Sequence, residues 1–409
     1  MSRAYNLTVL FVEKLLPLIG VFNKKLKRFY FQRKNTVSRI EEWSKTKSNK
    51  PIAWFHCASL GEYEMIVPII RHKLFFEKYE TIITFFSESG YNHSKILYGT
   101  GSKFYLPIDS LSKMRRMVTC LNPSLFVLVK YELWFNLLKA LEEQSIRRVL
   151  VNGNFINSHF VFGFFGKPYQ QKLKNFERIY VLNESVHRNL VEHGFTNSQV
   201  LSDLRYTRVA MVAESNTSHE LIERFVQNKT TLIIGSSWPH EEDLVLRYLL
   251  EVNPDIRVII APHDVSEPHI LEIVQKFKNV GVSRISAAKD HKGEQVLILD
   301  TIGHLSSAYQ YADIAFVGGA FGKGLHNVLE ALAFGLPIIT GPKISKFPEA
   351  LELQNEGLLV SIQSYEQGFV QTLRSLIDDV DRRNQLKVDA KLFLKAKTGE
   401  LDSFVKELL

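Results

Sequence analysis

The segment 313-DIAFVGGAFGKGLHNVLEALAFGLPIITGP-342 decides the fold class of this chain. Its apolar run 314–317 predicts a buried strand, and the glycine-rich loop 318–324 follows that strand directly. A helix is expected to open near residues 326–327 and to end at 335–337, where Gly-Leu-Pro precedes another apolar run. Glycines let a ligand approach the backbone closely, and free N–H groups at a helix start attract a phosphate. The pattern therefore predicts nucleotide binding; the simpler alternative is a strand–turn–helix packing motif.

Short apolar runs alternate with amphipathic stretches on both sides of this segment. One series comprises 51–57, 80–86, 124–130, 147–152 and 178–183, and a second comprises 230–235, 255–261, 296–299, 313–318 and 336–340. Strands separated by about 15–30 residues of helical pattern indicate right-handed crossovers and parallel sheets. We therefore expect an α/β protein with two Rossmann-like halves and a cleft at the carboxyl ends of their strands.

These patterns predict that the chain is divided into four parts. A basic arm over 1–50 precedes a first Rossmann-like domain over 51–213, and a second such domain covers 220–385. The charged stretch 386–409 is expected to be a helix that packs across the domain junction.

The arm carries the positive charge of the protein. The chain of 409 residues has a formal net charge of +8, whereas residues 1–50 alone carry +9. The apolar run 7–22 followed by lysines, arginines and aromatics suits the surface of an anionic membrane. The alternative is a helix docked on the protein's own core. No uninterrupted apolar run reaches the ~18 residues of a transmembrane helix, and no signal-peptide cleavage site is evident.

The rest of the composition narrows the functional class. The body is nearly neutral and has no RNA-binding aromatic motif, which argues against nucleic acid as a partner. Cys57 and Cys120 provide no zinc spacing and no disulfide framework, so we expect a reducing compartment. The histidines form no metal-binding motif, so neither a metal nor another cofactor is expected.

Three carboxylates are candidates for chemistry. Glu62 follows a strand and a glycine turn, and such a carboxylate is a candidate general base or merely a helix-start acid. Glu132 follows the strand that ends at Lys130, with the same two interpretations. Glu330 lies about one turn into the helix of the glycine-rich segment, where a carboxylate can accept ribose hydroxyls.

The ordered set of motifs resembles the 3-deoxy-D-manno-octulosonic acid (Kdo) transferases of lipid A biosynthesis. The motifs are WFHCASLGE (54–62), PID (107–109), YELW (131–134), LVNGNFINS (150–158), GSSWPHEE (235–242), DTIGHL (300–305) and GLHNVLEALAFGLPIITGP (324–342). The resemblance implies a GT-B fold and an N-terminal membrane attachment at the cytoplasmic face of the inner membrane. It also implies an inverting, metal-independent transfer of Kdo from CMP-Kdo to a lipid A precursor.

The resemblance also implies roles for particular residues. Glu62 takes the position of the catalytic base, and Glu132 and Arg205 take two positions that stabilise the transition state. The acceptor is expected near Glu62 and the loop 87–90. The nucleotide-binding positions are Ser236, Ser237, Pro262, His263, Ile302, Gly303, His304, Asn327, Val328, Leu329 and Glu330.

The chain departs from the family pattern at the nucleotide site, where His263 stands in place of a common arginine. Lys323, Lys343 and His240 are the alternatives for the missing charge. Two other functions stay open on the sequence: another GT-B nucleotide-sugar enzyme, such as an epimerase, and a non-catalytic membrane-bound nucleotide-binding protein. The number of Kdo units transferred, the acyl pattern of the acceptor and the oligomeric state are not set by these motifs.

Overall fold

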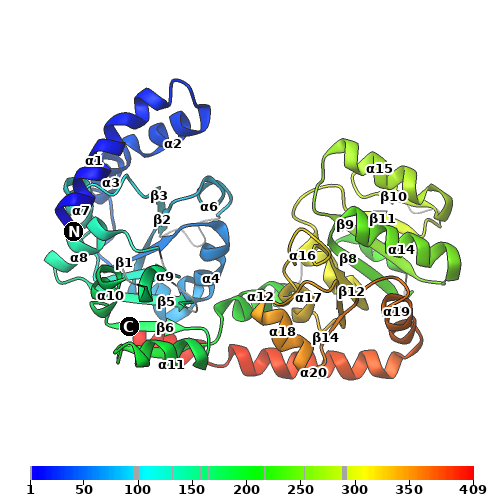
Figure 1. Cartoon of the computed structure of the whole chain (residues 1–409). Helices are drawn as coiled ribbons and strands as arrows, with labels where there is room; N and C mark the ends of the chain where they lie inside the picture. Colours follow the sequence, from blue (N-terminus) through cyan, green and yellow to red (C-terminus); the bar gives the residue numbers. More distant parts are fainter. Residues whose placement is uncertain are drawn as a thin grey trace. The chain divides into compact units, whose positions relative to one another are not determined.

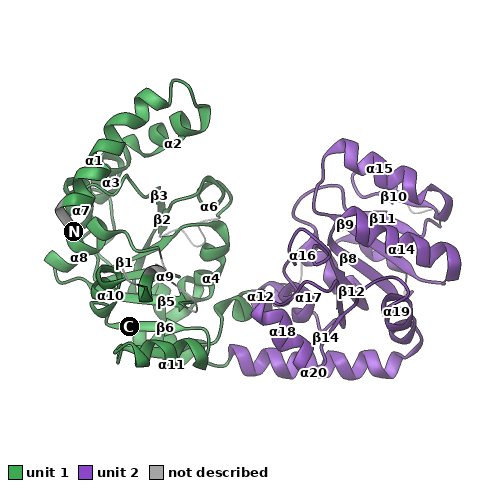
Figure 2. Ribbon diagram, viewed as in Figure 1, with its two compact units in different colours: residues 1–208, 399–409 green, residues 209–398 purple. Residues whose placement is uncertain are grey.

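Two compact units make up the chain in the computed structural model (Figure 2). Unit 1 contains residues 1–208 and 399–409, and unit 2 contains residues 209–398. The structure describes residues 2–94, 101–130, 132–155, 159–163, 166–215, 218–227, 229–252, 254–287 and 293–409.

Unit 1 is built on a parallel sheet of seven described strands in the order β3-β2-β1-β4-β5-β6-β7. The strands are β1 (Ile52–Cys57), β2 (Glu80–Phe85), β3 (Gly101–Tyr105), β4 (Leu125–Val129), β5 (Arg147–Gly153), β6 (Arg178–Val181) and β7 (Ser198–Val200). β1 lies between β2 and β4, with Phe55 opposite Ile83 and Val127. The strand order therefore reverses at β1, and this is where α/β folds bind their ligands.

Helices cover both faces of this sheet (Figure 1). They are α1 (Ser2–Ile19), α2 (Lys24–Lys34), α3 (Thr36–Ser44), α4 (Leu60–Arg71), α5 (Lys73–Lys78), α6 (Glu88–His93), α7 (Leu111–Leu121), α8 (Phe135–Glu143), α9 (His159–Phe162), α10 (Lys167–Lys174), α11 (Glu184–Glu192) and α21 (Leu401–Leu408). Helix α12 (Leu204–Glu214) spans the boundary between the units.

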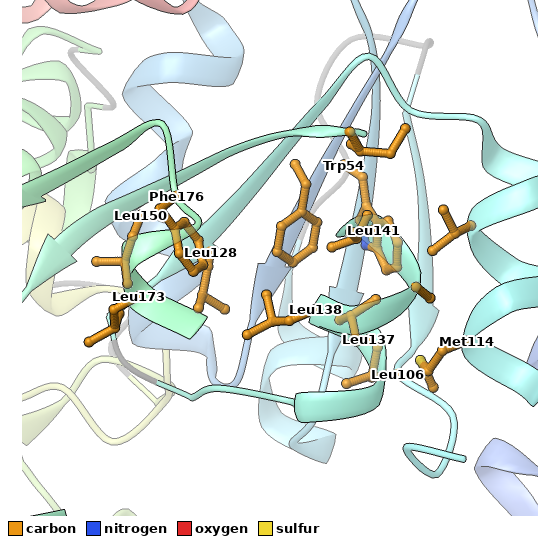
Figure 3. Packing of buried hydrophobic residues seen from close by; sticks show 14 of the residues in the cluster. Trp54, Leu106, Met114, Leu128, Leu137, Leu138, Leu141, Leu150, Leu173 and Phe176 are labelled. Carbon is orange, nitrogen blue, oxygen red and sulfur yellow. The ribbon is translucent and has the colours of Figure 1, made fainter. Parts of the chain in front are cut away.

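Alternate residues of β1 supply two separate cores, one on each face of the sheet. Trp54 packs with Leu128, Leu138 and Met114 on one face (Figure 3). On the other face, neighbouring β1 residues pack against α4, α5 and the returning helix α21. A strand covered on both faces reads as a continuous apolar run, which is why IAWFHC is apolar at nearly every position.

Unit 2 repeats the architecture with the order β10-β11-β9-β8-β12-β13-β14. Its strands are β8 (Thr231–Ser237), β9 (Arg257–Pro262), β10 (Val282–Arg284), β11 (Val296–Ile298), β12 (Ile314–Val317), β13 (Ile338–Thr340) and β14 (Leu359–Ser361). Its helices are α13 (Glu220–Val226), α14 (Pro239–Val252), α15 (Glu267–Phe277), α16 (Leu305–Ala308), α17 (Leu329–Ala333), α18 (Pro348–Asn355), α19 (Phe369–Asp378) and α20 (Val380–Thr398), with 3-10 turns at Lys278–Val280 and Tyr309–Tyr311.

The expected fold class is confirmed, since both units are parallel Rossmann-like sheets. Each expected strand has a counterpart, and four short strands were not expected: β3, β7, β10 and β14. The helix of the glycine-rich segment begins at Leu329 rather than near 326–327. The backbone N–H of His326 donates to the carbonyl of Gly318, which holds this residue in the loop.

The two ends of the chain contain more helices than the sequence indicated. The arm over 1–50 contains α1, α2 and α3, and the stretch 386–409 is divided between α20 and α21. Phe404, Val405 and Leu408 of α21 are buried in the core of unit 1. The final helix therefore belongs to the compact unit that contains the N-terminus.

Candidate active site

Glu62 lies in the first turn of α4, directly beyond the carboxyl end of β1. Ser59 caps this helix and accepts a hydrogen bond from the Glu62 N–H at 3.4 Å. The Glu62 carboxylate is itself buried and accepts a hydrogen bond from the Ala58 N–H. Burial raises the pKa of Glu62, while the Ala58 N–H and the charge of Lys130 act in the opposite direction. A carboxyl group with a raised pKa at a strand end is suited to accept a proton.

Glu132 belongs to the same electrostatic cluster. Its pKa is raised by burial and by the negative charge of Glu62, and Lys130 partly opposes this increase. Among the described residues, its buried Oε2 has no hydrogen-bond partner. The structure thus brings together two of the expected catalytic residues, and Lys130 is a cation whose charge acts on both.

A buried hydrogen-bond network supports the turn that carries Glu132. The indole N–H of Trp134 donates to His56 Nε2 at 3.0 Å, so the other ring nitrogen of His56 bears the proton. His56 Nδ1 and the Trp54 indole N–H lie 3.0 and 2.9 Å from the hydroxyl of Thr84. Burial lowers the pKa of His56 to about 3, so the ring is neutral. The sequence reasoning missed this role, although His56 stands inside the WFHCASLGE motif.

Arg205 lies in the first turn of α12, and its guanidinium pairs with Asp203 at 2.7 Å. Asp203 also accepts a hydrogen bond from the side chain of Asn152 at 3.1 Å. The helices of Arg205 and Glu62 are joined by an ion pair between Arg208 and Glu64. Arg205 is therefore on a helix that an ion pair joins to α4, and its guanidinium pairs with Asp203.

In each unit, strained backbone occurs at the carboxyl ends of strands. Lys130, Asn152 and Ser236 have positive φ values of 66°, 54° and 53°, which non-glycine residues rarely adopt. All three lie where a strand ends, and the pairing registers of β5 with β6 and of β8 with β9 shift there. Strained backbone at this position is typical of functional sites.

The glycine-rich loop of unit 2 is closed by its own backbone. The N–H groups of Gly322 and Gly324 both donate to the carbonyl of Gly319, at 3.1 and 2.9 Å. Gly319 has φ +93°, and a Cβ there would lie 2.2 Å from the Gly324 carbonyl oxygen. The turn therefore requires glycine at this position.

The sequence reasoning passed over two acids, one that holds this loop in place and one that holds the end of β8. Glu241 is buried and accepts hydrogen bonds from the backbone N–H groups of Gly319 and Trp238, at 2.7 and 3.1 Å. Glu242 is fully buried and accepts a hydrogen bond from the Ser237 hydroxyl at 2.9 Å. The sequence feature that could have revealed these two acids is the Glu-Glu pair of GSSWPHEE, one helical turn after the strand.

Stacked rings lie beside the loop. His263 stacks on Trp238 and on His326, with ring centroids 4.7 and 4.5 Å away. The Trp238 indole N–H donates to His326 Nε2 at 3.0 Å, and the planes of the two rings are 13° apart. The Lys323 ammonium lies 5.4 Å from the centre of the Trp238 ring. The structure thus groups the expected residue His263 with Trp238 and His326, which were not expected, and with one exposed lysine.

Glu330 is oriented by two neighbours. Its carboxylate accepts hydrogen bonds from the Ser306 hydroxyl at 2.7 Å and the Asn327 side chain at 2.9 Å. The expected loop 302–304 precedes Ser306; its Ile302 is highly exposed, and the His304 ring lies 5.0 Å from that of His219. Val328 and Leu329 are buried, so side-chain contacts to a ligand would come from their neighbours.

Some expectations fall on residues outside the described part of the chain. Tyr131 of YELW and residues 156–158 of LVNGNFINS are among them. Within the described residues, no group of three or more His, Cys, Asp or Glu side chains is placed to hold a metal ion. No helix in the described part of the chain has the length and apolar character needed to cross a bilayer.

In comparisons with known proteins, part of each unit matches a family model. Residues 28–208 match the family model of 3-deoxy-D-manno-octulosonic-acid transferases, and residues 283–393 match that of the group 1 glycosyl transferases. The chain is 27% identical to a 3-deoxy-D-manno-octulosonic acid transferase of Chlamydophila psittaci over 74% of its length and 72% of the relative. It is 24% identical to the protein of the same name from Haemophilus influenzae, over 91% of this chain and 89% of the relative.

A solved structure supports the fold assignment. The UDP-GlcNAc 2-epimerase of Neisseria meningitidis bound to UDP-GlcNAc superimposes with a TM-score of 0.60 at 13% identity. The match covers 88% of this chain and 98% of that one. At this identity the likeness shows the GT-B fold alone. Together with the family models, it makes this chain a glycosyltransferase of GT-B architecture.

Proposed function

We propose that this chain, whose residues 28–208 match the family model of 3-deoxy-D-manno-octulosonic-acid transferases, transfers Kdo from CMP-Kdo to a lipid A precursor in lipopolysaccharide biosynthesis. The observation that carries the proposal is the carboxylate pair at the switch point of unit 1. Glu62 is buried, has a raised pKa and shares its surroundings with Glu132 and Lys130.

The proposed reaction is a direct displacement with inversion. Glu62 accepts the proton of an acceptor glucosamine hydroxyl as its oxygen bonds to the anomeric carbon of Kdo. The bond from that carbon to the phosphate oxygen breaks, and CMP leaves with the electron pair. Glu132 stabilises the positive charge that develops on the sugar, and Arg205 pairs with the carboxylate of Kdo or the phosphate of CMP.

Unit 2 is proposed to bind CMP. Glu330 is held by Asn327 and Ser306 in an orientation that leaves lone pairs for ribose hydroxyls. The expected nucleotide residues contain no lysine or arginine, so the phosphate needs a cation from elsewhere. Lys323 is exposed on the loop beside the ring stack, and we assign it this role ahead of Lys343 and His240.

The arm is proposed to hold the enzyme on the cytoplasmic face of the inner membrane. Polar residues of α1 bind the rest of unit 1. The Tyr5 hydroxyl donates to Asp109 at 2.8 Å, and Asn6 accepts from the Leu111 N–H at 3.0 Å. Glu13 forms an ion pair with Lys113. Several exposed side chains of this arm are instead large and apolar: Leu7, Phe11, Leu18, Val21, Phe22 and Phe31. An apolar outer face next to Lys24, Lys25 and Lys27 fits an anionic bilayer surface.

Nucleotide binding tests the donor half of the proposal. Titration calorimetry with CMP, UMP and UDP should show binding of CMP at the lowest concentration. A preference for UDP would contradict the proposal and favour a UDP-sugar enzyme with the same fold. A chain that binds CMP but transfers nothing would be the non-catalytic alternative.

A further inference from the structure

Arg33 is an unusual residue in the arm, because its charge is almost completely buried. Its side chain is in α2, and the residue is 2% exposed. The guanidinium donates to the backbone carbonyls of Phe29, at 3.0 Å, and of Phe86. Among the described residues, no carboxylate forms an ion pair with it. Burial lowers its pKa only to about 10, so the side chain stays charged at neutral pH.

Aromatic rings surround the guanidinium. The guanidinium carbon lies 3.7 Å from the centre of the Phe29 ring, 4.8 Å from that of Tyr105 and 5.3 Å from that of Phe86. Burying a charge is costly unless its hydrogen bonds and electrostatic partners are supplied. Phe86, just after β2, supplies a carbonyl and a ring, and Tyr105 of β3 supplies a second ring. The negative charge of Glu88 adds an attraction, while Arg33 Nε has no hydrogen-bond partner among the described residues. These contacts fasten the arm helix to the end of the sheet.

The anchored segment is the loop expected to hold the acceptor. Phe86 directly precedes Ser87, which caps α6 by accepting the Gly90 N–H at 3.1 Å. Glu88, the first residue of α6, accepts hydrogen bonds from Gln32 at 2.8 Å and from Arg28 at 2.7 Å. Three side chains of α2 therefore bind residues 86–88.

Side-chain packing also connects Phe86 to the segment that carries Glu132. The Phe86 ring lies 5.2 Å from that of Trp134, whose indole N–H donates to His56. Trp134 is two residues beyond Glu132. Packed side chains therefore connect Arg33 to the turn that carries Glu132.

We propose that Arg33 is a positioning residue: it fixes the loop 86–90 and, through Phe86 and Trp134, the turn of Glu132, so that helix α2 shapes the acceptor site as well as the membrane contact. This inference rests on the proposed function for its account of acceptor use. The positioning itself is independent of that function and has its own readout.

The test replaces Arg33 with methionine in the full chain, and measures transfer kinetics, CMP affinity and hydrogen exchange. Arg33→Met should raise the KM for the acceptor about tenfold or more, because small displacements near reacting groups are costly. It should also speed exchange in residues 86–94 and leave CMP affinity unchanged. Arg116→Gln is the matched control, since Arg116 is an exposed arginine of unit 1 paired with Glu41.

Glu88→Gln is the second variant, because loss of a half-exposed carboxylate should not prevent folding. It should shift acceptor KM and exchange in the same direction by a smaller factor. A folded Arg33→Met protein with wild-type exchange and acceptor KM would overturn the proposal, as would an unaffected Glu88→Gln if Arg33→Met fails to fold. Failure of the proposed function is distinguishable, since the wild type itself would then transfer nothing while the exchange comparison still applies.

Discussion

At the scale of single residues, the charges around Glu62 set the pH at which it can act. A general base must be ionised, and burial raises the pKa of Glu62 above its ordinary value. The fraction of ionised Glu62 therefore grows with pH, and kcat/KM should fall on the acid side at a higher pH than the titration of a free glutamate.

Replacing Lys130 tests this electrostatic account. The charge of Lys130 lowers the pKa of Glu62 and of Glu132. In Lys130→Met, the acid limb of the pH–rate profile should therefore move to higher pH. Lys73→Met, at an exposed lysine of α5, should leave the limb unchanged. A shift of the acid limb to lower pH in Lys130→Met would show that Glu62 is not the titrating group.

Lys323 makes a separate prediction for the donor. Lys323→Gln should weaken CMP binding about tenfold, the size expected when a charged hydrogen bond to phosphate is lost. Binding of cytidine, which has no phosphate, should not change. Lys278→Gln provides an exposed lysine of the same unit as the control. Equal affinity of the wild type and Lys323→Gln for CMP would assign the phosphate to another cation.

At the scale of elements, the glycine-rich loop of unit 2 has no room for a side chain at Gly319. Gly319→Ala should weaken CMP binding about tenfold or more, because a Cβ would strain a positive φ and collide with the Gly324 carbonyl. Gly322→Ala should have little effect, since no atom lies within 4 Å of a Cβ there. Similar CMP affinities of the two variants would mean that loop closure is irrelevant to the nucleotide.

The sequence predicted the elements well where burial alone determines them. Both sheets were recognisable, since strands such as IAWFHC are apolar throughout, and Glu62 and Glu132 were both singled out. The helix of the glycine-rich segment was placed too early, because the hydrogen bond from His326 to Gly318 joins residues across the loop. The roles of His56, Glu241 and Arg33 also depend on partners far away in sequence, and no local pattern contains those partners.

At the scale of the whole molecule, the proposed contact of the arm with an anionic membrane makes a prediction of its own. The combined substitution of Lys24, Lys25 and Lys27 by glutamate should reduce binding to anionic vesicles more than tenfold, since each basic residue near such a surface contributes ~1 kcal/mol. Flotation with anionic and neutral vesicles measures this. The same change at the exposed Lys387, Lys391 and Lys395 of α20 is the control, and an equal loss in both variants would contradict a role of the arm.

The most direct measurement of the central claim is the mass of the lipid product. The full chain is incubated in detergent with CMP-Kdo generated in situ and a tetraacylated lipid A precursor, beside Glu62→Gln. We predict a gain of one or more Kdo masses with the wild type, and a rate about 100- to 10,000-fold lower with Glu62→Gln at unchanged CMP affinity. An unchanged lipid with folded, CMP-binding wild-type protein, or full turnover by Glu62→Gln, would contradict the account.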